Sequence, residues 1–166
     1  MVIKIKGIKD SQKQQLVKEI AEWSLKKLLN TKDDYRDPPL KLTITFKECD
    51  TAALTVNHDW DLLYPRRFEI IINSRQDTMD AILAVAHEMV HVKQWISGEF
   101  HHDRINDEYF WQGKIVEFDP DSPSHWENEY YDLPWEIEAL GREHGLVVQW
   151  MHHKNLHGNL PDWYRQ

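Results

Sequence analysis

The sequence predicts an α+β fold, in which a small mixed β-sheet packs on an N-terminal helix and on a second, buried helix. Three segments carry this prediction. Residues 40–47 alternate strictly between apolar and polar side chains, which is the period of a strand with one buried face. Residues 77–97 are apolar on nearly all sides, as expected of a helix inside a core. A last long helix should run from Trp135 to Trp150 or His153, with a short tail after it.

The chain begins with a predicted strand and helix. Residues 2–6 alternate in the way of a short half-buried strand, which Gly7 closes. Asp10 or Ser11 can cap the helix that follows, and its apolar residues recur at the spacing of one stripe facing a core. We expect this helix to end near Asn30.

Further strands are expected in the next part of the chain. An exposed loop over residues 33–39 carries charges and two prolines. After the 40–47 strand comes a weaker strand candidate over residues 52–56. A β-branched run over residues 68–73 predicts another strand.

The second half of the chain is predicted to hold two helices around an irregular segment. Asp77 or Thr78 begins the buried helix, and Gly98 is well placed just past its end. Residues 99–134 are polar, aromatic and irregular, with one possible hairpin around Gln112-Gly113. Pro134 then fits the first turn of the last helix.

Length and composition limit the class of protein. A chain of 166 residues fits one domain, spanning 1–166. Its 41% hydrophobic and 29% charged residues are typical of a soluble globular protein. The formal net charge of −8 works against a general binder of nucleic acid or anionic membranes, because those surfaces require a basic face.

The compartment is predicted to be the cytoplasm. The lone cysteine, Cys49, excludes an internal disulfide. The N-terminus lacks the continuous apolar region of a secretory signal, and no apolar run approaches the ~18 residues that span a bilayer.

The buried helix carries the pattern His-Glu-x-x-His, at His87, Glu88 and His91. Histidines four apart lie on one helix face, so both imidazoles can reach one metal ion at about 2.0 to 2.1 Å. Glu88 lies about 100° around the helix from His87, which places its carboxylate beside the metal rather than on it. Ten histidines in the chain make a chance match conceivable. Buried ionisable groups are costly unless paired or bound to metal, however, so this triad predicts a zinc ion as its partner.

A catalytic zinc needs a third protein ligand and one open position for water. Glu136 and Glu138 open the last helix and are the candidates. Acidic residues in a first turn also complement the helix dipole, which is the alternative interpretation of the pair. Two residues apart on a helix, they face about 200° from one another and should not both bind the same ion.

These motifs resemble the zincin metallopeptidases, in particular the gluzincin branch. In that branch the third ligand is commonly the first Glu of a Glu-x-x-Ala pattern, which fits Glu136-Ile-Glu-Ala139. The resemblance therefore implies Glu136 as the ligand, with Glu138 as the alternative. Residues 133–139 and 109–114 are also similar to small single-domain proposed metallopeptidases of bacteriophages and bacteria. The likeness covers roughly residues 40–150.

One position departs from the gluzincin pattern. In several gluzincins an Asp four residues after the glutamate ligand hydrogen-bonds a metal-binding histidine, and Leu140 stands there in this chain. Glu138 or Asp132 could orient a histidine instead, since metal-bound imidazoles nearly always donate their other N–H to a carboxylate or carbonyl.

The resemblance implies a zinc-dependent metallopeptidase acting on a peptide or protein substrate. Glu88 would take the proton from a water that the zinc activates, and the resulting hydroxide would attack the carbonyl. Candidates for stabilising the oxyanion are Tyr130, Tyr131, His125 and His144. An extended peptide would pair with an edge strand, which by this likeness is residues 68–73 or 52–56.

Two other interpretations of the zinc motif stay open. The chain could be a catalytically silent zincin-like binding or structural module, although a structural zinc site has no need of a base such as Glu88. It could also be a zinc amidase acting on a non-protein carbonyl. The remaining histidines, at His101-His102, His152-His153 and His157, are expected to be solvated surface rather than a second metal site.

Overall fold

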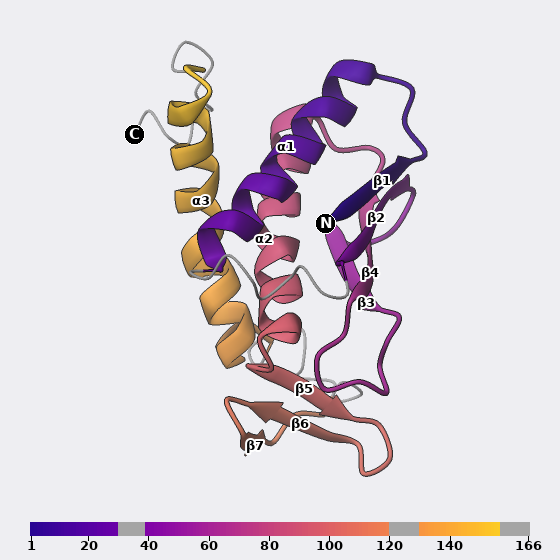
Figure 1. Ribbon diagram of the computed structural model, residues 1–166, viewed down its shortest axis with the longest axis vertical. Helices are drawn as coiled ribbons and strands as arrows, with labels where there is room; N and C mark the ends of the chain where they lie inside the picture. The colour runs from indigo at the N-terminus through magenta and orange to yellow at the C-terminus, as the bar shows by residue number, and fades with distance from the viewer. Residues whose placement is uncertain (30–38, 120–129, 157–166) are drawn as a thin grey trace.

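The computed structural model describes residues 1–29, 39–119 and 130–156, and within them the α+β prediction is confirmed. Two small sheets and three α-helices make up the fold (Figure 1). The elements are β1 Val2–Lys6, α1 Ser11–Leu28, β2 Lys41–Lys47, β3 Ala53–Asn57, β4 Arg67–Asn73, α2 Thr78–Ile96, β5 Phe100–Asp103, β6 Glu108–Trp111, β7 Lys114–Val116, the 3-10 turn η2 Tyr130–Asp132 and α3 Pro134–His153.

The larger sheet has the strand order β1-β2-β4-β3. β1, β2 and β4 are parallel, whereas β3 is antiparallel to β4 and forms one edge. The alternation predicted for β2 is confirmed, because Leu42, Ile44 and Phe46 are buried on the helix-covered face. The sequence interpretation offered β4 as a possible edge strand. That alternative is wrong, since β4 lies between β2 and β3 and both of its edges are hydrogen-bonded.

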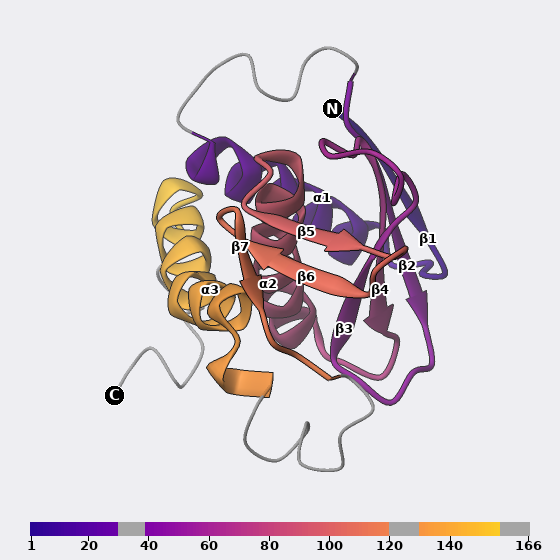
Figure 2. The same cartoon turned by 90° about the horizontal axis from the view of Figure 1, so that it is seen from below.

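α2 is the central helix of the molecule. It packs against α1, α3, β3 and β4, so the sheet lies on one side of it and α3 on the other (Figure 2). The Asp77 carboxylate caps its start by accepting the backbone N–H of Asp80 at 2.9 Å. Gly98, with φ +71°, follows its end. This packing holds most side chains of α2 in fixed positions.

A second sheet, β5-β6-β7, lies at the C-terminal end of α2 (Figure 1). The predicted hairpin is confirmed as β6 and β7, with Gln112 and Gly113 both at positive φ in the turn. β5 was expected to be irregular and is instead a strand paired with β6. Phe100 on β5 stacks edge-on against Trp95 at 4.6 Å between ring centroids. Aromatic packing therefore attaches this sheet to the end of α2.

The predicted boundaries of the helices agree with the structure where it describes them. Asp10 caps α1 by accepting two backbone N–H groups, and Pro134 is the first residue of α3. Asn30, the 33–39 loop up to residue 38 and the C-terminal tail from residue 157 lie outside the described residues. In the part that is described, no helix combines the length and the apolar character needed to cross a membrane.

Candidate metal centre

The two histidines of α2 point to the same place. His87 and His91 are one turn apart, and their Nε2 atoms lie 3.1 Å from each other. The apolar residues around them on α2 are buried against the sheet and against α3. The helix therefore presents both imidazoles from one rigid face.

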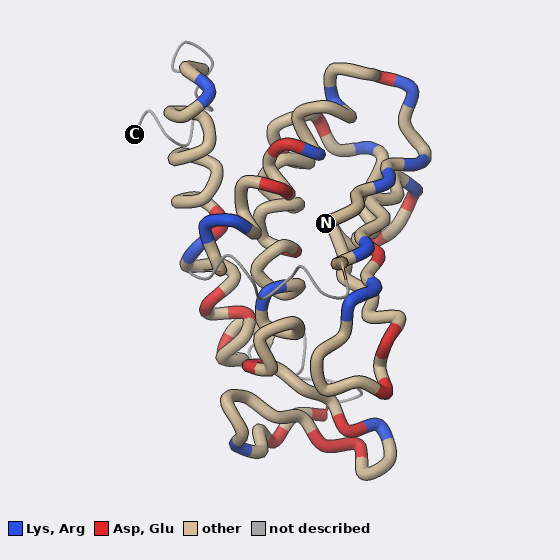
Figure 3. Tube along the Cα trace, viewed as in Figure 1, with Lys and Arg blue, Asp and Glu red and all other residues tan. Residues whose placement is uncertain are grey.

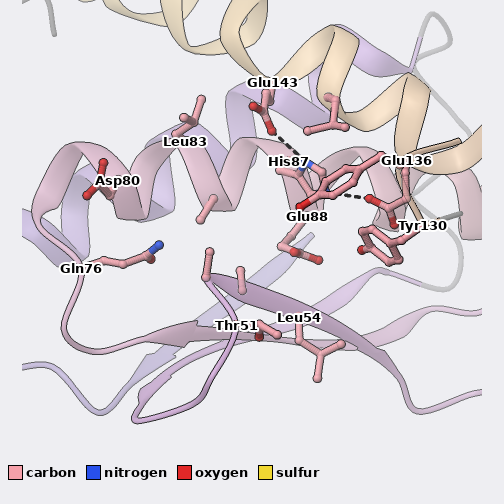
Figure 4. A pocket seen from close by; sticks show the side chains of 15 residues that line it. Thr51, Leu54, Gln76, Asp80, Leu83, His87, Glu88, Tyr130, Glu136 and Glu143 are labelled. Atoms are coloured by element: carbon pink, nitrogen blue, oxygen red, sulfur yellow. Dashed lines mark hydrogen bonds and ion pairs between the residues drawn. The ribbon is translucent and has the colours of Figure 1, made fainter. Parts of the chain in front are cut away.

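Glu136 brings a carboxylate to the same place from the first turn of α3. Its Oε2 lies 3.3 Å from His87 Nε2 (Figure 4), and its Oε1 lies 3.3 Å from His91 Nε2. The side chain is buried, with 4% of the residue exposed. One ligand atom from each of these three residues lies within 4.8 Å of the other two, so the group could hold a metal ion. Among the described residues this is the one such group.

The outward nitrogen of each histidine is also bound. His87 Nδ1 lies 2.7 Å from Oε2 of Glu143, which stands two turns after Glu136 on α3 (Figure 4). His91 Nδ1 lies 2.9 Å from Oε1 of Gln94. Both partners are acceptors, so they favour a proton on Nδ1 and leave each Nε2 free to bind a metal.

Glu138 does not lie where a third metal ligand would have to lie. Its carboxylate accepts from Lys93 Nζ at 3.0 Å and from Gln94 Nε2 at 3.1 Å, away from the three-residue group. Gln94 in turn contacts His91, so Glu138 reaches a histidine through Gln94 and not directly. Asp132 is exposed at the end of η2, and no contact places it on either histidine.

Glu88 is held by a residue of the edge strand. Thr55 of β3 donates its hydroxyl to Glu88 Oε2 at 2.7 Å. Glu88 is buried, with 5% exposed, yet it lines two cavities beside His87 and His91. β3 thus sets the direction of the carboxylate that the sequence pattern predicts as the base.

Burial and ion pairing shift the pKa values of the three residues in opposite directions. Burial disfavours the charged His87 imidazole, but hydrogen bonds to Glu136 and Glu143 outweigh it and raise the pKa of His87 to about 10. Burial would also raise the pKa of Glu136, but hydrogen bonds from His87 and His91 lower the pKa of Glu136 to about 2. The pKa of His91 is raised in the same way, against burial, by Glu136 and Glu88. Metal binding would displace these imidazole protons.

Tyr130 is the oxyanion candidate closest to this centre. It lines both cavities, and its hydroxyl hydrogen-bonds to Glu136. Burial, together with the Glu136 charge, raises the pKa of Tyr130, so the hydroxyl keeps its proton and can donate. Tyr131 lines one cavity but is 59% exposed. His144 pairs with Glu143 and lines neither cavity, and His125 lies outside the described residues.

His102 and His153 contact neighbouring side chains, whereas Nδ1 of His101 is buried without a hydrogen-bond partner among the described residues. His102 Nε2 lies 3.0 Å from Asp107, and the ring stacks on Tyr109 at 4.1 Å. His102 is half-buried, so the predicted solvated surface is wrong for this histidine. His153 stacks on Trp23 at 4.5 Å. His157 lies outside the described residues.

Sequence reasoning missed Glu143, Gln94 and Thr55. Glu143 could have been found, because it stands seven residues after Glu136 and so returns to the same helix face. Gln94 follows His91 by three residues on α2 and carries the same kind of signal. Thr55 carried no signal in the sequence, because its contact with Glu88 depends on how β3 lies against α2.

Comparison with known proteins gives no match among protein-family models, curated proteins or solved structures. The function is therefore argued from the site itself.

Proposed function

We propose that this protein is a zinc-dependent metallopeptidase with a zincin-like fold and site. His87, His91 and Glu136 would hold the metal, and Glu88 would be the general base. Two imidazoles and one carboxylate are a donor set that catalytic zinc uses, with the fourth position left for water.

The spacing of the three donors is the observation that carries the proposal. Zinc bonds of about 2.0 to 2.1 Å in a tetrahedron put neighbouring donor atoms roughly 3.3 Å apart. In this site the two Nε2 atoms lie 3.1 Å apart, and each lies 3.3 Å from a different oxygen of Glu136. With one ligand atom from each residue lying within 4.8 Å of the other two, this arrangement supports a zinc ion among the three residues.

The chain's own residues supply the proton transfers. When bound, the zinc would lower the pKa of a water toward neutrality and polarise the substrate carbonyl. Glu88 faces the cavities beside the two histidines, where it can accept the proton of the attacking water and later deliver it to the leaving amine. Tyr130, kept protonated, can donate to the oxygen on which negative charge develops.

β3 is the strand that would align a peptide substrate. It forms an edge of the larger sheet, and its residues Ala53 and Leu54 line both cavities beside Glu88. An extended peptide can add to such an edge through main-chain hydrogen bonds. Such pairing would bring a backbone carbonyl of the peptide next to the predicted base.

Zinc content tests the ligand assignment. The purified protein should contain about one zinc per chain. Glu136→Ala should lose the zinc, whereas Glu138→Ala, the control from the same helix turn, should retain it. Loss from Glu138→Ala alone would contradict the assignment, and a wild-type chain that binds no zinc would overturn the proposal.

Hydrolysis of a peptide library tests the reaction. Glu88→Gln should keep the zinc but lose hydrolysis, because the amide cannot take the proton. A zinc-loaded wild type as inert as Glu88→Gln across peptides would favour the silent binding module instead.

A further inference from the structure

The larger of the two cavities runs from the metal centre toward the N-terminal end of α2. It has a volume of about 560 Å³. Its walls are mainly apolar and come from three elements. Leu54 of β3 and Leu83 of α2 line it (Figure 4), as does Leu140 of α3. We call this cavity the α2 cleft.

Apart from His87, every ionisable residue that lines the α2 cleft and is charged at neutral pH is acidic. The lining includes Asp80, Glu88, Glu136 and Glu143 and neither lysine nor arginine. The lysines of β1 and β2 lie along the larger sheet (Figure 3), and Lys13 reaches the backbone carbonyl of Gln76 without lining the cleft. Even with a divalent ion at the metal centre, the four carboxylates leave the cleft with negative charge.

Asp80 is the carboxylate that the metal centre does not use. It lies seven residues before His87, two turns away on the same helix face, or about 10 Å along the axis. Its backbone N–H is bound by Asp77, but no partner of its carboxylate is found among the described residues. The Asp80 charge is therefore available to a group that enters the cleft.

Gln76 stands at the same end of the α2 cleft as Asp80 (Figure 4). Its backbone carbonyl accepts from Lys13 Nζ at 2.7 Å, which fixes this residue just before α2. Its side-chain Oε1 is buried and has no hydrogen-bond partner in the part of the chain described. A buried acceptor without a donor is costly, so this end of the cleft calls for a donor.

The direction of β3 tells which part of a peptide reaches the cleft. β3 runs from Ala53, which lines the α2 cleft, toward Thr55, which lines only the smaller cavity. A peptide that pairs with it in the more stable antiparallel sense runs the opposite way. Its residues after the cleaved bond then lie over the α2 cleft.

We propose that the α2 cleft selects a lysine or arginine side chain on the residue immediately after the cleaved bond. The inference rests on the proposed function. The long aliphatic stem would lie along the leucine walls, and the cationic head would reach Asp80 and Gln76. A short side chain would not span the distance, and an acidic one would meet four carboxylates.

Binding tests the pocket without hydrolysis. Zinc-loaded Glu88→Gln is titrated with one peptide carrying lysine, arginine, norleucine or glutamate at the variable position, followed by calorimetry. Lysine and arginine should bind about tenfold more tightly than norleucine, which matches the stem but lacks the charge. Adding Asp80→Asn should remove the preference, whereas adding Asp61→Asn, an exposed acid outside the cleft, should leave it unchanged. Equal binding of norleucine and lysine would overturn the inference.

Cleavage tests the direction. The zinc-loaded wild type should cut on the amino side of lysine and arginine, and Asp80→Lys should shift the preference toward glutamate. Cleavage without preference would overturn the inference and leave the proposed function standing. Cleavage on the carboxyl side would overturn the antiparallel placement. If no peptide is cut but the lysine peptide still binds selectively, the proposed reaction fails while the cationic selectivity of the cleft stands.

Discussion

Thr55 shows how much of a site can depend on one hydroxyl. It is the residue of β3 that hydrogen-bonds the predicted base, at 2.7 Å from Glu88 Oε2. A carboxylate has two oxygens, and binding one of them leaves the other free for the proton of a water. Thr55 is therefore a positioning residue for Glu88.

Thr55→Val keeps the shape of the side chain and removes this hydrogen bond. Hydrogen bonds to charged groups contribute about 1.5 to 3 kcal/mol, so we expect kcat to fall by roughly tenfold or more. KM and zinc content should change little. Steady-state kinetics on a cleaved peptide measures the split.

Two matched variants separate positioning from a general effect of the mutation. Thr55→Ser retains the hydroxyl and should recover most of the rate. Thr43→Val makes the same change on the opposite face of the sheet and should leave kcat unaltered. A Thr55→Val protein with wild-type kcat would exclude the positioning role.

At the scale of elements, Gly7 fixes how β1 ends. It has φ +79°, and a Cβ at this position would lie 2.0 Å from the backbone oxygen of Phe46. That oxygen belongs to β2, so it cannot move without breaking the parallel pairing of β1 with β2. The sequence predicted that Gly7 closes the strand, and the close approach supplies the physical reason.

Gly7→Ala should lower the free energy of unfolding by at least about 2 kcal/mol, since it adds both a strained φ and a clash. Gly145→Ala is the control, because an added Cβ there meets nothing within 4 Å and α3 gains a better helix former. It should raise stability by about 0.5 to 1 kcal/mol. Urea unfolding compares the two, and a Gly7→Ala protein as stable as wild type would contradict the role of the turn.

Sequence patterns predicted the single helices and strands better than they predicted which of these elements lie side by side. The 3.6-residue period was enough to place His87, Glu88 and His91 on one helix, and helix geometry excluded a shared role for Glu136 and Glu138. The order of the strands was not readable in the same way. Which of residues 52–56 and 68–73 lies at the edge depends on pairing between distant segments, and the Thr55–Glu88 contact depends on that order. β5 was missed because its residues do not alternate between apolar and polar: Phe100 packs on Trp95 of α2, and His102 stacks on Tyr109 of β6.

At the scale of the whole molecule, the metal centre joins two parts of the chain. α2 supplies His87 and His91, and α3 supplies Glu136 from 45 residues after His91. In an unfolded chain these ligands are not preassembled. A metal bound by these residues would therefore stabilise the folded state over the unfolded one.

Chelation of zinc should lower the melting temperature. Free zinc at about a thousand times its dissociation constant contributes roughly 4 kcal/mol, which for a domain of this size corresponds to about 10 °C. Differential scanning calorimetry with and without chelator measures the shift, and added zinc should reverse it. Glu136→Ala should melt at one temperature under both conditions. A wild type that loses its zinc without any change in melting temperature would contradict a ligand set shared by α2 and α3.

The two edges of the larger sheet differ in chemistry. β1 carries Lys4 and Lys6, whereas β3 reads Ala-Leu-Thr-Val-Asn and has no charge. Charged residues on an edge strand discourage another chain from adding to it. The sheet is therefore guarded against aggregation on the β1 side and can lengthen on the β3 side alone. If a strand of another chain added to β3, it would cover the α2 cleft, so aggregation at this edge would also prevent substrate binding.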